Sequence, residues 1–238
     1  MPKPLTEWKV LPHGELRTVE ENILTVTGDI PMPLAKLKRR MSVVRLRDRR
    51  LVIFSAIALC REDMSFLEAF GTPAFLIVPN AHHRLDAKIW KDRYPAIRVI
   101  TPPGAREKVQ KVVPVDATDV DFDDPGVTFV TVGGTDEQEA ALEVRRADGT
   151  TLILNDVVGN LRDTSGFGGW FLRLMKFAGD KPHIPLPVKI SLADKPAFAA
   201  QLRRWAGLPS LKRILVSHGR IIDDDPGGTL RALAASLK

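Results

Sequence analysis

Cysteine and aromatic residues are scarce in this 238-residue chain, and each shortage excludes a class of protein. Cys60 is the single cysteine, so an internal disulfide framework and a zinc knuckle are both excluded. Its neighbours Ile57, Ala58 and Leu59 are small or apolar, and we expect Cys60 to lie among them in the core. One such thiol is consistent with a reducing cytoplasm.

Long apolar runs are also missing. No stretch of about 18 apolar residues occurs, and residues 1–8 lack the apolar segment of a signal peptide. We therefore expect a soluble, unexported, cytoplasmic protein. With 44% hydrophobic residues the chain can bury a substantial core, and its length is consistent with one domain over residues 1–238.

A formal net charge of +6 raises the question of nucleic-acid binding, but the sequence offers little else for it. Tyr94 is the only tyrosine, and no aromatic stacking platform or recognition-helix module is present. In the most basic stretch, residues 36–50, arginines at 45 and 47 alternate with Val44 and Leu46, which is typical of a strand with one wet face at a sheet edge. We expect no nucleic acid, and an anionic lipid or phosphorylated substrate stays open.

One nucleotide-binding signature and one hydrolase signature are also absent. The chain has no Walker-type glycine-rich loop. Ser217-His218-Gly219 lacks the Gly-x-Ser-x-Gly frame of a nucleophilic serine.

Hydrophobic periodicity predicts an α/β protein, with a β-rich start followed by alternating strands and helices. The predicted strands cover residues 23–27, 42–46, 51–55, 75–78, 97–100, 127–132, 139–145, 151–154 and 214–216. The predicted helices cover residues 64–70, 87–94 and 195–205, with a last apolar helix face at Leu230, Leu233 and Leu237. Residues 71–100 fit a βαβ unit, and the helix over 195–205 should cover a sheet.

Metal-binding residue types stand where the predicted strands end. His82 and His83 follow one apolar strand, Asp156 follows a second, and His218 follows a third. The carboxyl ends of strands form the ligand crevice of open α/β sheets, and imidazole and carboxylate are ligands for zinc, iron and manganese. Taken alone, each histidine is also consistent with a hydrogen-bonded turn residue.

The order of elements and these motifs resemble the metallo-β-lactamase fold, an αββα sandwich of two mixed β-sheets covered by helices. Residues 152–156 resemble the strand that ends at the bridging aspartate, Asp156, and residues 216–219 resemble the final histidine motif. The resemblance spans most of the chain and indicates a divergent branch with degenerate metal motifs, marked by the Pro-Asn-x-His-His segment at residues 79–83.

Two motifs depart from the family pattern. Residues 78–86 allow two alignments. In one, Asn80 and His82 stand at the two leading histidines, and Arg84 and Leu85 replace the Asp-His pair. In the other, which we favour, His82-His83 stands at the Asp-His pair. Gly134 stands where the Gly-His-Thr loop of the family has its histidine. The resemblance therefore implies a mononuclear rather than a two-metal site. The implied ligands are His82 or His83 with Asp156 and His218, and the auxiliary candidates are Asn80, Asp86 and Glu139.

The implied activity is hydrolysis of a small-molecule ester, thioester, lactone or phosphoester. One divalent ion, zinc, iron or manganese, would activate water, with Asp156 and His218 as catalytic residues. The alternative is a metal-free pseudoenzyme that binds a ligand, a partner or a membrane surface through the same crevice.

A glycine- and aromatic-rich stretch lies between the strands that lead to Asp156 and His218. We interpret residues 162–188 as a lid insertion in which Trp170, Phe171 and Met175 contact an apolar substrate. A helix packed on the core and a segment inserted shallowly into a membrane surface are the other interpretations.

Overall fold

A computed structural model describes residues 2–31, 37–161 and 179–237. The described residues fall into two compact units, one ending at residue 125 and one beginning at residue 126, and each is presented by itself. The single-domain organisation stays a prediction. Most of the predicted lid, with Trp170, Phe171 and Met175, lies outside the described residues. Among the helices that are described, none has the length and hydropathy needed to cross a bilayer.

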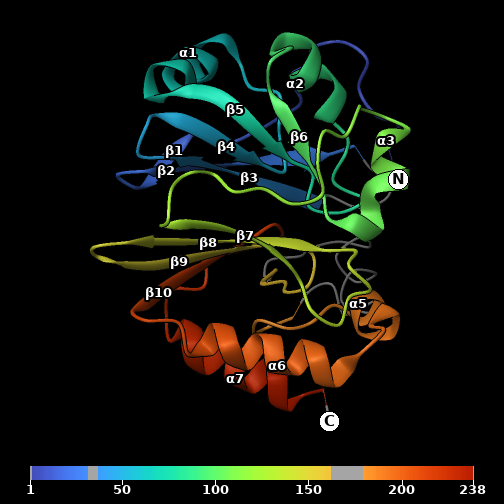
Figure 1. The fold of residues 1–238 in the computed structure, drawn as a ribbon, viewed down its shortest axis with the longest axis vertical. Coiled ribbons are helices and arrows are strands. Elements are labelled where there is room, and N and C mark those ends of the chain that lie inside the picture. Colours follow the sequence, from blue (N-terminus) through green and yellow to red (C-terminus); the bar gives the residue numbers. More distant parts are fainter. Residues whose placement is uncertain (1, 32–36, 162–178, 238) are drawn as a thin grey trace. The chain divides into compact units, whose positions relative to one another are not determined.

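The first unit is built on a six-stranded mixed sheet in the order β1-β2-β3-β4-β5-β6 (Figure 1). Neighbouring strands are antiparallel from β1 to β4 and parallel from β4 to β6. The strands are β1 (Arg17–Glu20), β2 (Ile23–Ile30), β3 (Leu37–Arg45), β4 (Arg50–Phe54), β5 (Thr72–Ile77) and β6 (Arg98–Ile100). The helices are α1 (Arg61–Phe70), α2 (Ala87–Arg93), η1 (Pro103–Ala105) and α3 (Arg106–Gln110). Of these, α1 and α2 lie over the sheet (Figure 1).

The core of this unit explains why its helices form where they do. Met64 and Leu67 of α1 and Ile89 and Trp90 of α2 are buried in one cluster with apolar residues of the sheet. Met64 and Leu67 are three residues apart, as are Ala87 and Trp90 of α2, and this is the spacing of a helix that buries one face. The predicted β3–β4 hairpin is confirmed, and so is the β5-α2-β6 unit with its parallel strands.

The second unit has a four-stranded mixed sheet in the order β10-β9-β8-β7. Its strands are β7 (Val127–Thr131), β8 (Ala140–Arg146), β9 (Gly149–Leu154) and β10 (Leu211–Val216), and its helices are α5 (Leu186–Ser191), α6 (Lys195–Ala206) and α7 (Pro226–Ala235). Helices α6 and α7 pack on each other and lie against the sheet (Figure 1). The predicted cover by the helix over 195–205 is confirmed, because Phe198, Leu202 and Trp205 are buried in the unit's core.

Three expectations differ from the structure. Residues 17–20, 106–110 and 186–191 form β1, α3 and α5, which the sequence pattern does not predict. Cys60 is half-buried rather than in the core, because it lies at the start of α1. The prediction of a solvated sheet edge at the basic stretch is wrong, because β3 pairs with β2 on one side and with β4 on the other.

A buried ion pair explains how a basic strand can lie inside the sheet. Arg39 is buried in β3 and forms an ion pair with Asp86. Alternation of charged and apolar residues separates the two faces of a strand, and it does not reveal a buried counter-ion.

Candidate metal centre

Asp156 and His218 are brought together by two adjacent parallel strands. β9 and β10 run in register to their carboxyl ends, where Val216 lies opposite Leu154. The Ser217 backbone N–H extends this pairing by donating to the Leu154 carbonyl oxygen at 3.1 Å. Just beyond, the His218 Nε2 and Asp156 Oδ1 atoms are 3.1 Å apart, and the two side chains are 12% and 17% exposed. The pair is therefore held by the sheet and still reaches solvent.

The glycine after His218 is required by the local backbone. Gly219 has φ +104°, and a Cβ built there would lie 2.1 Å from the Asn160 carbonyl oxygen. The Asn160 backbone N–H in turn donates to the His218 carbonyl oxygen at 3.0 Å. These backbone contacts fix the position from which the His218 side chain extends.

A buried polar network supports the residues on either side of the pair. Ser217 Oγ donates to Asn155 Oδ1 at 2.8 Å, and Asn155 Nδ2 donates to Glu139 Oε2 at 3.1 Å. All three side chains are buried, so their hydrogen bonds hold the strand-end backbone in one arrangement. The structure therefore joins Glu139, an auxiliary candidate, to the residue that precedes Asp156.

His82 and His83 lie in the first unit, in a loop that Asn80 organises. The Asn80 Oδ1 accepts the backbone N–H of His82 at 2.7 Å and that of His83 at 3.0 Å. This arrangement is an Asx turn, so Asn80 shapes the loop. The two histidines differ, because His82 is exposed and His83 is buried.

Ser55 positions the buried histidine, and the sequence analysis did not find it. Ser55 follows β4, and its Oγ lies 2.7 Å from His83 Nδ1. It has φ +58°, a left-handed conformation that is uncommon for a residue with a side chain. With Nδ1 directed at Ser55, Nε2 is the ring nitrogen that would ligate a metal. No sequence signal marks Ser55, since the contact joins residues 28 positions apart.

Asp86, another auxiliary candidate, has structural partners for both carboxylate oxygens. Oδ2 forms an ion pair with Arg39, and Oδ1 accepts the Ala58 backbone N–H at 2.8 Å. Burial raises the pKa of Asp86, while the Arg39 guanidinium opposes that shift. These contacts join the start of α2 to β3 and to the segment that follows β4.

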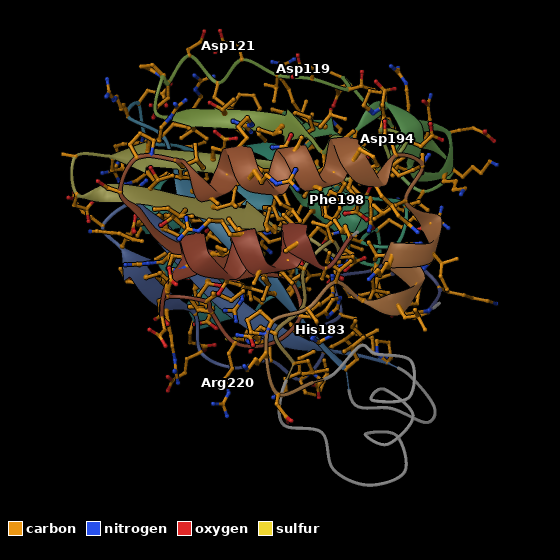
Figure 2. The ribbon with its side chains drawn as sticks, turned by 90° about the horizontal axis from the view of Figure 1, so that it is seen from below. Asp119, Asp121, His183, Asp194, Phe198 and Arg220 are labelled. Carbon is orange, nitrogen blue, oxygen red and sulfur yellow. The ribbon has the colours of Figure 1, made fainter. Side chains whose placement is uncertain are left out.

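Close packing explains why position 134 is occupied by glycine. Gly134 has φ +81°, and a Cβ built there would lie 2.2 Å from the Asp194 carbonyl oxygen and 2.6 Å from the Phe198 backbone nitrogen. Asp194 is the N-cap residue of α6, and Phe198 lies in its first turn (Figure 2). The Gly134 carbonyl oxygen also accepts the Asp194 backbone N–H at 3.2 Å. With α6 in this place, position 134 has no room for a side chain of any kind.

The donor set of the second unit fits a divalent ion. A tetrahedral zinc site with bonds of about 2.0 Å has ligand atoms about 3.3 Å apart. The distance of 3.1 Å between His218 Nε2 and Asp156 Oδ1 is close to that separation of ligand atoms. One imidazole and one carboxylate suit zinc, iron or manganese.

Comparisons with known proteins extend the fold assignment to nearly the whole chain. No family model and no curated protein matches the sequence. Among solved structures, the DIM-1 metallo-β-lactamase exposed to ceftazidime aligns at TM-score 0.63 and 13% identity, covering 97% of this chain and 100% of that one. A metallo-β-lactamase from Hirschia baltica aligns at TM-score 0.61 and 10% identity, covering 92% and 97%. The mono-zinc form of FIM-1 from Pseudomonas aeruginosa aligns at TM-score 0.60 and 11% identity, covering 96% and 97%.

These alignments, with the two mixed sheets and their helices, confirm the α/β class that the sequence predicted. At such low identities they bear on the fold alone. The chain has the metallo-β-lactamase fold, with a sequence only 10–13% identical to those of these structural neighbours.

Proposed function

We propose that this protein is a metal-dependent hydrolase with one divalent ion held at Asp156 and His218. The observation that carries the proposal is the 3.1 Å separation of the two ligand atoms at the aligned ends of β9 and β10. Its fold neighbours are named metallo-β-lactamases, and one of them was solved in a mono-zinc form. A single ion is therefore compatible with this fold.

We further propose His83 as the third ligand, in preference to His82. His83 is buried, and Ser55 holds its Nδ1, which resembles the way in which metal-binding histidines are oriented by a hydrogen bond to the second ring nitrogen. His82 is exposed, and ordering a surface imidazole around an ion costs conformational entropy. This choice corresponds to the alignment in which His82-His83 replaces the Asp-His pair.

The two ligands of the second unit have distinct chemical tasks in this proposal. When bound, the ion would polarise a carbonyl or phosphoryl oxygen and lower the pKa of water. Asp156 would direct one carboxylate oxygen to the ion and offer the other to the attacking water, from which it accepts the proton. His218 would keep its ring in place through the backbone contacts of Gly219.

The substrate class follows from that chemistry. Esters, thioesters, lactones and phosphoesters each present a polarisable oxygen and a leaving group, and we propose a small molecule of this kind. A β-lactam should be assayed beside these substrates, because it has a strained acyl carbonyl.

The test is elemental analysis of untagged protein purified without chelator. We expect His218→Ala and His83→Ala each to lose about one equivalent of metal relative to the wild type, as expected for a site that needs all its ligands. The matched controls are His82→Ala, which removes the exposed neighbour, and His183→Ala, which removes a histidine from the loop before α5 (Figure 2). Both controls should keep the wild-type metal content.

A wild type that contains no metal, and takes up none during incubation with zinc, iron or manganese, contradicts the proposal. Loss of metal in His82→Ala but not in His83→Ala would select the other alignment of residues 78–86. Folding of each variant is checked by circular dichroism.

A further inference from the structure

A second group of metal-binding side chains lies in the first unit, and none of them belongs to the proposed hydrolase site. His13, Cys60 and Asp63 each offer one ligand atom, and these atoms all lie within 4.8 Å of one another. His13 comes from the segment before β1, whereas Cys60 and Asp63 come from the start of α1. The His13 Nδ1 and Asp63 Oδ2 atoms are 3.8 Å apart, with side chains 8% and 25% exposed.

The segment that carries His13 is held against the unit by several contacts. The Leu5 backbone N–H donates to the Leu85 carbonyl oxygen at 2.8 Å. The Trp8 indole N–H donates to the Leu59 carbonyl oxygen at 3.1 Å. An antiparallel bridge joins His13 to residue 28 in β2. The imidazole therefore has a fixed place beside α1.

The start of α1 presents the other two ligands on one side of the helix. Cys60 is the N-cap residue, and Asp63 follows three positions later in the first turn. Residues three apart on a helix are neighbours on its surface. Both residues are partly exposed, so their side chains can rotate toward an ion.

The hydrogen bonds of His13 hold its ring in one tautomer. The Cys60 backbone N–H lies 3.3 Å from His13 Nε2, so Nε2 is the acceptor in this contact. His13 Nδ1 then carries the proton and donates to the Gly14 carbonyl oxygen at 2.7 Å. Histidines that bind metal through one ring nitrogen commonly donate the other N–H to a backbone carbonyl, so Nε2 is the nitrogen that can ligate an ion.

We propose that His13, Cys60 and Asp63 bind one thiophilic divalent cation such as zinc, with water in the fourth position. Thiolate, imidazole and carboxylate are all zinc ligands, with bonds of about 2.0–2.3 Å that place the ligand atoms roughly 3.3–3.7 Å apart. Cys60 and Asp63 are both partly exposed, so rotation of their side chains can bring their ligand atoms to this spacing from Nε2. The ion takes the place of the Cys60 backbone N–H as the partner of His13 Nε2. It thereby joins the segment before β1 to α1.

The only cysteine of the chain makes this site directly observable. Co²⁺ bound to a thiolate gives a charge-transfer absorption in the near ultraviolet, which the proposed hydrolase site cannot give because it has no sulfur ligand. We expect titration of the full chain with Co²⁺ to produce this band. Cys60→Ser should abolish it, and His13→Gln and Asp63→Asn should each weaken the binding that produces it at least tenfold. Zinc should displace the cobalt and remove the band.

His218→Ala is the control, and it should keep the full band, so failure of the hydrolase proposal does not affect this test. A wild type without the band overturns the inference. The inference is also overturned if the band survives unchanged in either His13→Gln or Asp63→Asn, because the three residues would then not act as one ligand set. Circular dichroism of each variant separates loss of a ligand from loss of folding.

Discussion

Ser55 combines an unfavourable backbone conformation with a side-chain contact to His83, and two substitutions separate the effects. We expect Ser55→Ala to lower the free energy of unfolding by about 1–3 kcal/mol, because it removes a hydrogen-bond partner from a buried ring nitrogen. Ser55→Gly loses the same contact but relieves the left-handed backbone at φ +58°, so it should be about 1 kcal/mol more stable than Ser55→Ala. Urea denaturation of both variants measures the difference. Equal stabilities would show that the backbone carries no strain here.

Adjacent glycines test the packing of the loop between β7 and β8. In Gly134→Ala the new methyl group meets backbone atoms of α6 at 2.2 and 2.6 Å, so the free energy of unfolding should fall by about 2 kcal/mol or more. Gly133 is the matched control, because a Cβ there has its nearest neighbour at 3.7 Å. Gly133→Ala should stay within about 1 kcal/mol of the wild type in the same denaturation experiment. Similar losses in both variants would contradict the steric explanation.

For single residues, the sequence is most informative where a side chain follows a strand. Asp156 and His218 are predictable in this way, because parallel neighbouring strands bring their carboxyl ends together. The roles of Ser55, Arg39 and His13 are not predictable, since their partners are distant in sequence and only the folded chain brings them close. The long-range partners of the candidate residues therefore had to come from the structure.

Helices α1 and α2 are joined by a cluster of charged and aromatic side chains. The Tyr94 hydroxyl donates to Glu68 Oε1 at 2.5 Å, and Arg93 Nη2 donates to the same atom at 3.1 Å. Burial, and then the hydrogen bond to Glu68, raises the pKa of Tyr94 from 10.0 to about 12. The same hydroxyl holds the pKa of Glu68 below its usual value.

The pH dependence of this contact follows from the protonated phenol. The folded state favours neutral Tyr94, so this contribution to the free energy of unfolding is complete below pH 10.0 and is lost as pH rises through about 12. Tyr94 is the only tyrosine, so tyrosinate absorbance reports its titration directly. We expect a midpoint of about 12 in the native protein, a midpoint of 10.0 in denaturant, and a lower native midpoint in Glu68→Gln.

Glu107→Gln is the control for that titration, because it also removes one carboxylate but breaks an exposed ion pair with Lys111 at α3 instead. Its native midpoint should equal that of the wild type. A native midpoint equal to the denatured one would contradict the assigned hydrogen bond between Tyr94 and Glu68.

Helices and strands can be predicted from the sequence where their buried apolar residues recur at regular spacing, and they are missed where no such spacing exists. The amphipathic spacing of Phe198, Leu202 and Trp205 is sufficient to predict α6 and the sheet that it covers. β1 has only exposed and half-buried residues, so it shows no alternation that would predict a strand. The wet-edge interpretation of the basic stretch is wrong because β3 lies between β2 and β4. The pattern also could not show that Arg39 there is neutralised by Asp86, 47 positions later in the chain.

For the whole molecule, the two proposed sites predict separable effects of metal on stability. A ligand that binds only the folded state stabilises it by about 2.7 kcal/mol at a free concentration roughly 100 times its dissociation constant. We expect zinc to raise the melting temperature of the wild type relative to a chelator-treated sample. His218→Ala and Cys60→Ser should each lose part of this zinc-induced rise in melting temperature. The double variant should lose all of it.

Calorimetry in zinc and in chelator provides this measurement. The two single-variant losses should add up to the loss in the double variant, because the proposed sites share no residue. An unchanged melting temperature of the wild type on addition of zinc would contradict both sites at once.

The tight approach of Gly134 to α6 also limits how this chain could change over generations of mutation. A histidine at position 134 would collide with the start of α6, because its Cβ alone would lie 2.2 Å from the Asp194 carbonyl oxygen. Lineages that begin from this sequence therefore cannot gain a metal-binding side chain at that position by one substitution. They would first have to lengthen the loop or displace the start of α6, and each intermediate would have to remain folded without yet gaining activity.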